Sequence, residues 1–186
     1  MKKKLVTSHW VSVHGFVARP NGEMDWIPPD PDMSAYELDL VRSADGLLLG
    51  SGTYADFAGF WPAVAADPSA PEEQRLYASE LNRLKKVVAS RSMTQALWDD
   101  TVFLSDITAN AVHAVMETLG RIVVYGSVGV VETLARRKLV DEFHLLSHPV
   151  ALGGGTPLFR AALDLRFVRS RTFASGVTLN VYRPAP

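Results

Sequence analysis

The stretch RIVVYGSVGVVETLARRKLVDEF, residues 121–143, decides the fold because it joins a buried strand directly to a helix. Val123, Val124 and Tyr125 are typical of a strand, and Ser127 is a typical N-cap of a helix. The helix is indicated by apolar residues at helical spacing followed by basic ones: Val130, Val131, Leu134, Arg136, Arg137 and Lys138. A strand that enters a helix through a glycine turn leaves backbone N–H groups free, which makes this junction a candidate anion site.

Further strand and helix patterns follow along the chain, although no stretch of sequence is repeated. Strands are predicted at residues 4–12, 13–18, 46–49, 86–90, 102–105, 142–152, 166–173 and 177–182, and further helices at 34–42, 53–60, 72–84 and 107–119. Because strands and helices alternate through the middle of the chain, we expect a parallel central sheet covered on both faces. The last two strands are joined by residues 174–176, which predicts an antiparallel hairpin. The sequence therefore predicts an α/β fold, a three-layer sandwich around a mixed, mainly parallel sheet.

Composition narrows the classes of function. The 186 residues suit one domain spanning 1–186, and 47% of them are hydrophobic, which is enough to build a core. The net charge of −1 gives no basic surplus for nucleic acid. No apolar run approaches the roughly 20 residues of a membrane span. We therefore expect a small-molecule partner, and neither nucleic acid nor membrane.

The chain contains no cysteine. This excludes disulfides, thiol nucleophiles and cysteine-bound metals, and is compatible with the reducing cytoplasm in which we expect the protein to work. His144 and His148 lie four residues apart on a predicted strand, which places them on one face but about 13 Å apart. Because one metal ion cannot span that distance, no metal site is predicted.

Three predicted strands end in small and hydroxyl-bearing residues. The first is followed by Gly50, Ser51, Gly52 and Thr53, the second by Ser90 and Arg91, and the third by Gly126, Ser127, Val128 and Gly129. Ligands of open α/β sheets bind beyond the C-terminal ends of parallel strands, so neighbouring tips would form a shelf for several phosphates. The alternative is that the glycines serve turn geometry alone, and neither glycine-rich nucleotide signature, G-x-G-x-x-G or G-x-x-x-x-G-K-[ST], occurs.

Arg91 is the only fixed cation expected at these three tips. It can make a bidentate contact with a terminal phosphate, such as the 2′-phosphate of NADPH. The alternative is an arginine that is simply solvated after its strand.

Six motifs carry a resemblance to a known family. In chain order they are SVHGFVA (12–18), MDW (24–26), LLLGSGTYADF (47–57), VYGSVGVVETL (124–134), LVDEFHL (139–145) and PVALGGGTPLF (149–159). Together they run almost from end to end and resemble the dihydrofolate reductase-like superfamily, in the branch of the C-terminal reductase domain of bacterial riboflavin biosynthesis. The resemblance implies a sheet of about eight strands, a homodimer, and a reductase acting on a pterin-like ring or a ribosylated aminopyrimidine, such as 5-amino-6-(5-phosphoribosylamino)uracil.

The resemblance also implies NADPH as the cofactor. Residues 50–53 would meet its phosphates, Ser90 and Arg91 its adenosine end, residues 126–129 its pyrophosphate, and Ala18 its nicotinamide. This chain departs from the family at two positions. Ser51 stands where the family commonly has arginine, and His14 stands where it commonly has aspartate.

A reductase also needs a proton source beside the reacting atom. The proline-rich loop before the first helix holds Asp25, Asp30 and Asp32, and in dihydrofolate reductases a helix in this region carries the substrate-binding acid. Counting back from Gly50 makes Asp32 the nearest match, so Asp32 is the predicted catalytic acid and Asp25 a predicted substrate contact. The alternative for each aspartate is a turn or helix-cap role.

Two tryptophans are predicted substrate contacts. Trp26 and Trp61 carry flat rings that suit stacking on a heterocycle, although core packing is the alternative.

The leading hypothesis is an NADPH-dependent reductase of a small heterocycle. No zinc-binding H-x-E or P-C-x-x-C motif appears, so the deaminase half of the riboflavin enzyme is absent. Two alternatives stay open: a non-catalytic nucleotide-binding or sensor dimer that keeps the fold, and a stand-alone reductase of foreign carbonyl compounds.

Overall fold

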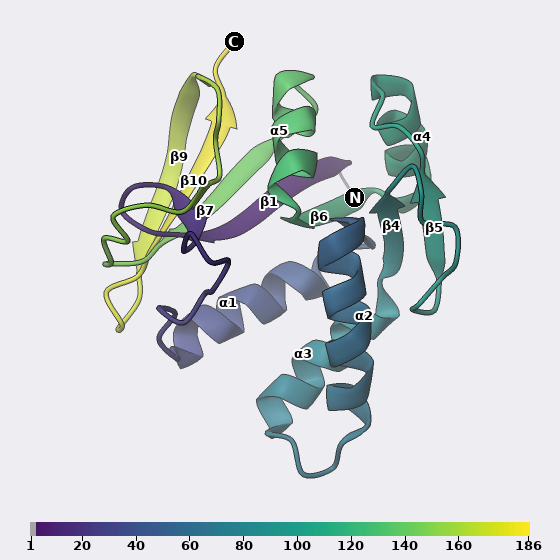
Figure 1. Ribbon diagram of the computed structural model, residues 1–186, viewed down its shortest axis with the longest axis horizontal. Coiled ribbons are helices and arrows are strands. Elements are labelled where there is room, and N and C mark those ends of the chain that lie inside the picture. The colour runs from purple at the N-terminus through teal and green to yellow at the C-terminus, as the bar shows by residue number, and fades with distance from the viewer. Residues whose placement is uncertain (1–2) are drawn as a thin grey trace.

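The computed structural model describes residues 3–186 and arranges them around one sheet of eight strands (Figure 1). In sheet order these are β5 (Thr101–Leu104), β4 (Lys85–Ala89), β3 (Gly46–Gly50), β6 (Arg121–Gly126), β1 (Lys4–Val11), β7 (Glu142–Ser147), β10 (Thr178–Pro184) and β9 (Leu165–Thr172). The first six run parallel, and β10 is antiparallel to both of its neighbours. The predicted mixed, mainly parallel sheet and its eight strands are confirmed.

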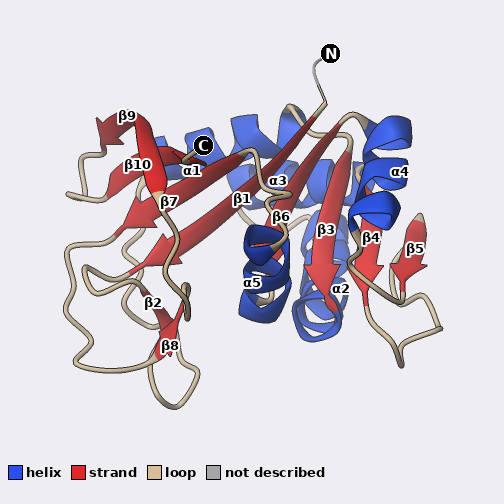
Figure 2. Cartoon of the chain, turned by 90° about the horizontal axis from the view of Figure 1, so that it is seen from above, coloured by secondary structure: helices blue, strands red, loops and turns tan. Residues whose placement is uncertain are grey.

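Helices cover both faces of this sheet (Figure 2). They are α1 (Pro31–Arg42), α2 (Ser51–Ala66) and α3 (Glu72–Arg83) on one face, and α4 (Ala109–Leu119) and α5 (Val128–Arg136) on the other. The apolar strand β3 serves both layers, since Leu47 and Leu49 pack with the first group of helices and Leu48 with the second. Within residues 3–186, no helix is both long and apolar enough to cross a bilayer.

Some predicted element boundaries were wrong. Helix α1 begins at Pro31 rather than at residue 34, because Asp30 caps it and proline suits the first helical position. Helix α2 continues through Pro62 to Ala66, beyond the predicted end at residue 60. The long strand predicted at 142–152 stops at Ser147, two residues before Pro149.

The GGGTP segment forms a strand that the sequence did not predict. Strand β8 (Thr156–Pro157) pairs with β2 (Phe16–Ala18) in a small second sheet, with an irregular register between Phe16 and Ala18. Gly155 precedes β8 with φ +149°, and a Cβ there would lie 2.0 Å from the Ala18 carbonyl oxygen. Glycine is therefore required for β8 to approach β2 this closely.

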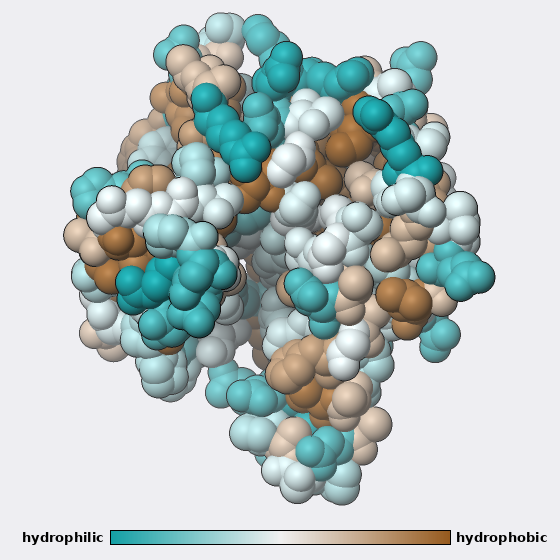
Figure 3. Space-filling view, viewed as in Figure 1, coloured by the Kyte–Doolittle hydropathy of each residue, from teal (hydrophilic) through white to brown (hydrophobic). Residues whose placement is uncertain are grey.

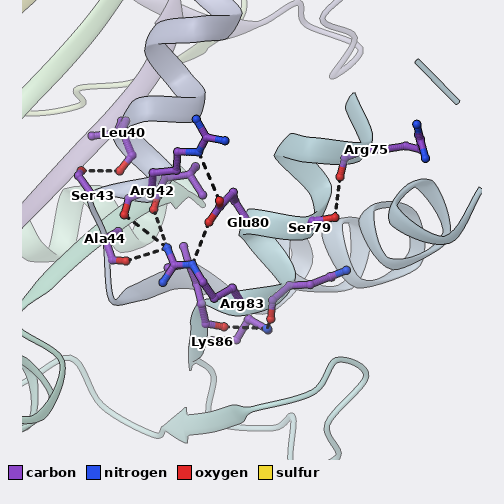
Figure 4. A network of polar contacts seen from close by, with 12 residues as sticks. Leu40, Arg42, Ser43, Ala44, Arg75, Ser79, Glu80, Arg83 and Lys86 are labelled. Carbon is purple, nitrogen blue, oxygen red and sulfur yellow. Dashed lines mark hydrogen bonds and ion pairs between the residues drawn. The ribbon is translucent and has the colours of Figure 1, made fainter. Parts of the chain in front are cut away.

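Helix α1 is held against α3 by a polar network at its C-terminal end (Figure 4). The Arg83 guanidinium donates to the carbonyl oxygens of Ala44 (3.2 Å), Val41 (3.4 Å) and Arg42 (3.5 Å). Glu80 accepts from both Arg83 (2.8 Å) and Arg42 (3.3 Å). The last carbonyls of α1 thus find donors on α3, which fixes the position of α1 beneath the sheet.

Candidate functional site

The three strand tips predicted from the sequence meet at one cavity. Strand β3 lies between β4 and β6, so the C-terminal ends of the three parallel strands share one edge of the sheet. A cavity of about 300 Å³ lies beyond that edge. The predicted cofactor residues that line it are Gly50, Ser51, Gly52, Ser90, Arg91, Ser127 and Gly129. The structure therefore brings together residues from three distant parts of the sequence.

Two helices begin at this cavity without a side-chain cap. Helix α2 starts after Gly50 and α5 starts after Ser127, whose hydroxyl makes no capping hydrogen bond although Ser127 occupies the predicted N-cap position. Both helices therefore present uncapped first turns and the positive ends of their dipoles to the cavity. The two starts are close, because a Cβ on Gly50 would lie 2.6 Å from Ser127 Oγ. Such a pair of helix starts favours an anionic ligand.

The cavity contains more positive charge than the sequence indicated. Arg137, at the C-terminal end of α5, lines it together with Arg91, so the cavity has a second fixed cation besides the one predicted at the strand tips. A neighbouring cavity of about 490 Å³ is lined by Arg91, Thr133, Arg136 and Arg137. The sequence did indicate that Arg137 could reach the cavity, because Gly129, Thr133 and Arg137 are four residues apart and lie on one face of a helix. Arg91 is exposed and lies 3.6 Å from Asp106.

Four predicted cofactor residues lie outside the lining of this cavity: Ala18, Thr53, Gly126 and Val128. Thr53 and Gly126 face each other beside it, since a Cβ on Gly126 would lie 3.1 Å from Thr53 Oγ1. Ala18 is buried at the end of β2, which contacts β1. Figure 3 shows a hollow in the middle of the face of the molecule that is turned toward the viewer. In Figure 1, which has the same view, α5 lies above this hollow, α2 to its right and the segment joining β1 to α1 to its left.

The predicted acids Asp25 and Asp32 are both exposed and paired with arginines. The Arg19 Nε atom lies 2.5 Å from Asp25 Oδ1, and that hydrogen bond lowers the pKa of Asp25. Arg171 lies 3.7 Å from Asp32. The helix cap is Asp30, which accepts hydrogen bonds from the backbone N–H groups of Met33 (3.0 Å) and Ser175 (2.9 Å). Hydrogen bonds at Ser175, followed by those at Met33 and Asp32, lower the pKa of Asp30 to about 2.

The two predicted substrate tryptophans are half-buried and pack against other aromatic rings. The Trp26 ring meets the His148 ring edge-on at 5.0 Å between centroids, and its Nε1 is buried without a partner among residues 3–186. Trp61 packs edge-on against Phe60 (5.0 Å) and Tyr77 (5.1 Å). The structure does not bring these two rings to the cavity at the strand tips.

Glu37 is an acid that the sequence analysis missed. It lies on α1, and its Oε1 accepts a hydrogen bond of 2.8 Å from Trp10 Nε1 at the end of β1. Burial raises the pKa of Glu37 to about 7, and the hydrogen bond from Trp10 opposes this rise. The signal was available, because Glu37 stands four residues after buried Met33 and three before buried Leu40, within the apolar stripe of the helix.

The fold and this site can be compared with known proteins. A family model described as RibD C-terminal domain matches residues 3–179. The Bacillus subtilis (strain 168) protein YyaP, described only as uncharacterized, is 30% identical over 185 residues, covering 97% of this chain and 95% of YyaP. YwjB from the same organism, also uncharacterized, is 24% identical over 189 residues and covers 98% of this chain.

Solved structures share the same architecture. A putative riboflavin biosynthesis protein from Shewanella sp. PV-4 superposes with a TM-score of 0.73 at 20% identity, covering 98% of this chain and 99% of that one. The diaminohydroxyphosphoribosylaminopyrimidine deaminase/5-amino-6-(5-phosphoribosylamino)uracil reductase of Thermotoga maritima gives a TM-score of 0.70 at 14% identity. The match covers 99% of this chain but 57% of that longer protein. The chain belongs to the RibD C-terminal domain family and has the dihydrofolate reductase-like fold.

Proposed function

We propose that this chain is an NADPH-dependent reductase that delivers a hydride to a carbon of a small heterocycle, either pterin-like or a ribosylated aminopyrimidine. The observation that carries the proposal is the meeting of three strand tips, two uncapped helix starts and two arginines at one cavity. Family membership supports a reductase of the pyrimidine class. When bound, the dinucleotide supplies the hydride.

The residues present suit a dinucleotide phosphate. Ser51, Gly52 and the start of α2 would hold one phosphate group, and Ser127 and Gly129 at the start of α5 the pyrophosphate. Ser90 and Arg91 would lie at the adenosine end. Ala18, beside β1, would lie at the nicotinamide end.

Arg91 and Arg137 would replace the arginine that the family commonly carries at the position of Ser51. They approach the same cavity from β4 and from the end of α5, so a 2′-phosphate between them would meet two guanidinium groups. Together with Arg136 in the adjoining cavity, this charge favours NADPH over NADH, because the two cofactors differ only in that phosphate.

The test is cofactor preference in an Arg91→Gln/Arg137→Gln double variant, measured as thermal stabilisation by NADPH and by NADH. We expect NADPH affinity to fall at least tenfold while NADH affinity is unchanged, since each charge-assisted contact is worth about 1.5–3 kcal/mol. Lys138→Gln is the matched control, because Lys138 is exposed, adjacent in sequence and absent from both cavity linings.

Failure of both dinucleotides to stabilise the wild-type protein would overturn the proposal. The hypothesis that would then remain is a non-catalytic nucleotide-binding or sensor dimer that keeps the fold. Stabilisation followed by substrate-dependent oxidation of NADPH would exclude that alternative.

A further inference from the structure

The second cavity, which adjoins the proposed dinucleotide site, is lined mainly by arginines. Its volume is about 490 Å³, against about 300 Å³ for the cavity at the strand tips. The lining consists of Arg91, which follows β4, and of Thr133, Arg136 and Arg137 in the C-terminal half of α5 and at its end. Guanidinium groups from two separate elements of the fold therefore meet around one space.

The helix dipole explains part of this arrangement but not all of it. Basic residues at the C-terminal end of a helix are ordinarily favoured by the negative end of its dipole. That explanation covers Arg136 and Arg137, but Arg91 reaches the same cavity from the end of β4. Because like charges repel, gathering a third guanidinium group here is unfavourable unless an anion lies among them. The convergence therefore favours an anionic ligand.

The two arginines of α5 have no anionic partner in the described chain. Neither Arg136 nor Arg137 forms an ion pair with a carboxylate of residues 3–186. Glu132 stands one helical turn before Arg136, yet it does not pair with it and does not line the cavity. Both guanidinium groups are exposed and can bind a ligand without losing a bond within the protein.

Arg91 also keeps its donors free, whereas the hydroxyl group in the lining does not. The Nε atom of Arg91 lies 3.6 Å from Asp106 Oδ1, which is too long for a hydrogen bond. Thr133 Oγ1 donates to the Gly129 carbonyl oxygen (2.8 Å), so its proton is already used. The donors that remain for a ligand are therefore guanidinium N–H groups.

The chemistry of the lining defines the class of anion. A guanidinium group presents a planar fork of N–H donors that fits two oxygens of a phosphate group. One phosphate group carries about −1.5 to −2 at pH 7, so three guanidinium groups are balanced better by two linked phosphates than by one. The lining contains no aromatic or aliphatic side chain of residues 3–186, so it has no surface for an apolar substituent.

We infer that this cavity binds a compact diphosphate anion, and that the bound anion excludes NADPH but not NADH from the adjoining site. Binding of the anion depends on the cavity alone, whereas the competition rests on the proposed function. An anion here engages Arg91 and Arg137, the two residues proposed to hold the 2′-phosphate of NADPH. NADH lacks that phosphate and does not need them. Diphosphate would therefore slow an NADPH-dependent reaction selectively.

The first test measures the anion alone, with inorganic pyrophosphate as the probe and the full-length chain without nucleotide. Isothermal titration calorimetry is run without divalent cations and at constant ionic strength, because salt screens exposed charges. The wild type should bind pyrophosphate about tenfold more tightly than sulfate. Arg136→Gln should weaken pyrophosphate binding about fivefold, an effect that allows for screening at an exposed site. Because Arg136 is exposed, this variant should fold like the wild type.

Arg160→Gln is the matched control. Arg160 is an exposed arginine outside both cavity linings, and its replacement changes the net charge equally. It should leave the affinity for pyrophosphate within about twofold of wild type. Equal affinities of the wild type and Arg136→Gln would overturn the inference, and so would wild-type binding of pyrophosphate no tighter than that of sulfate.

The second test measures competition in the wild-type protein, with the fluorescence of the reduced nicotinamide as the readout. Pyrophosphate at ten times its own Kd should raise the apparent Kd of NADPH about tenfold by mass action. The apparent Kd of NADH should change less than about twofold. An equal loss of both affinities would overturn the inference, because it would place the anion at the helix starts proposed to hold the pyrophosphate of either cofactor.

The outcomes separate this inference from the proposed function. If NADPH binds and pyrophosphate does not compete with it, the inference fails and the reductase stands. If neither dinucleotide binds but pyrophosphate binds in a manner that depends on Arg136, the reductase and the competition fail while the anion site stands.

Discussion

Single residues set the closest approaches in this fold, and Gly155 is the sharpest case. Its φ is +149°, and a Cβ at this position would lie 2.0 Å from the Ala18 carbonyl oxygen, so no side chain can be accommodated. Because the obstructing atom belongs to the backbone, it cannot rotate away. Gly154, one residue earlier, has only Pro20 Cγ nearby, at 3.8 Å, and no positive φ.

Gly155→Ala is therefore expected to destabilise the protein by about 2–4 kcal/mol, whereas Gly154→Ala should stay within about 0.5 kcal/mol of wild type. Urea denaturation of the two variants measures the difference. Equal stabilities would show that β2 and β8 are not packed as closely as described.

Residue identity also explains which parts of the site could be predicted. The glycine and serine tips were predicted because a βα junction leaves a local pattern in the sequence. The environment of each carboxyl group could not be predicted, because it depends on which of Asp25, Asp30, Asp32 and Glu37 meets an arginine, a pair of N–H groups or a tryptophan. Those partners lie far away in the chain, and local spacing carries no information about them.

At the scale of elements, the sequence predicted long periodic segments well and short ones poorly. Helix α5 and strands β3 and β6 lie where their apolar periodicity indicated. Strand β8 has two residues and no period of its own, so only its pairing with β2 defines it. Helix α1 began early because Asp30 gains a second partner, Ser175, from the turn between β9 and β10.

Strand β9 forms an edge of the sheet in the described chain and carries three arginines, Arg166, Arg169 and Arg171. All three are exposed, and two copies pairing edge to edge would bring six positive charges together. This is a recognised means of preventing sheets from joining. The predicted homodimer should accordingly use another surface.

Replacing these three arginines with threonine should promote self-association through β9, because threonine favours strands and removes the repulsion. Size-exclusion chromatography with light scattering measures it. The matched control replaces Arg91, Arg136 and Arg137 with threonine, which changes the net charge equally but away from the edge. Association in both variants would assign the effect to net charge alone.

Over the whole molecule, buried ionisable groups determine the response to acid. Burial lowers the pKa of His9, His144 and His148 to about 4. Because these folded values lie below the ordinary 6.5, the unfolded chain takes up protons first, and stability falls as the pH falls from 6.5 to 4. Glu37 acts oppositely, since its pKa is raised from 4.5 to about 7 and unfolding releases its proton between these values.

Between pH 4.5 and 6.5, unfolding should therefore take up about two protons in total, because the three histidines gain protons and Glu37 releases one. The free energy of unfolding should fall by about 2.7 kcal/mol per pH unit there. Glu37→Gln removes the opposing contribution and should steepen the fall to about 4 kcal/mol per pH unit. Urea titrations at several pH values measure both slopes. His14→Gln, at an exposed histidine, is the control, and a flat profile would show that the three histidines are not buried in neutral form.

The position of β1 in the sheet has a consequence for synthesis on the ribosome. This strand is made first, yet its partners β6 and β7 begin at Arg121 and Glu142. At roughly 5–20 residues per second, β1 waits on the order of 6–25 s before β6 is even translated. During that interval β1 lacks both of its neighbours in the sheet, so ribosome-associated chaperones should engage nascent chains that end before about residue 140 and release those that extend further.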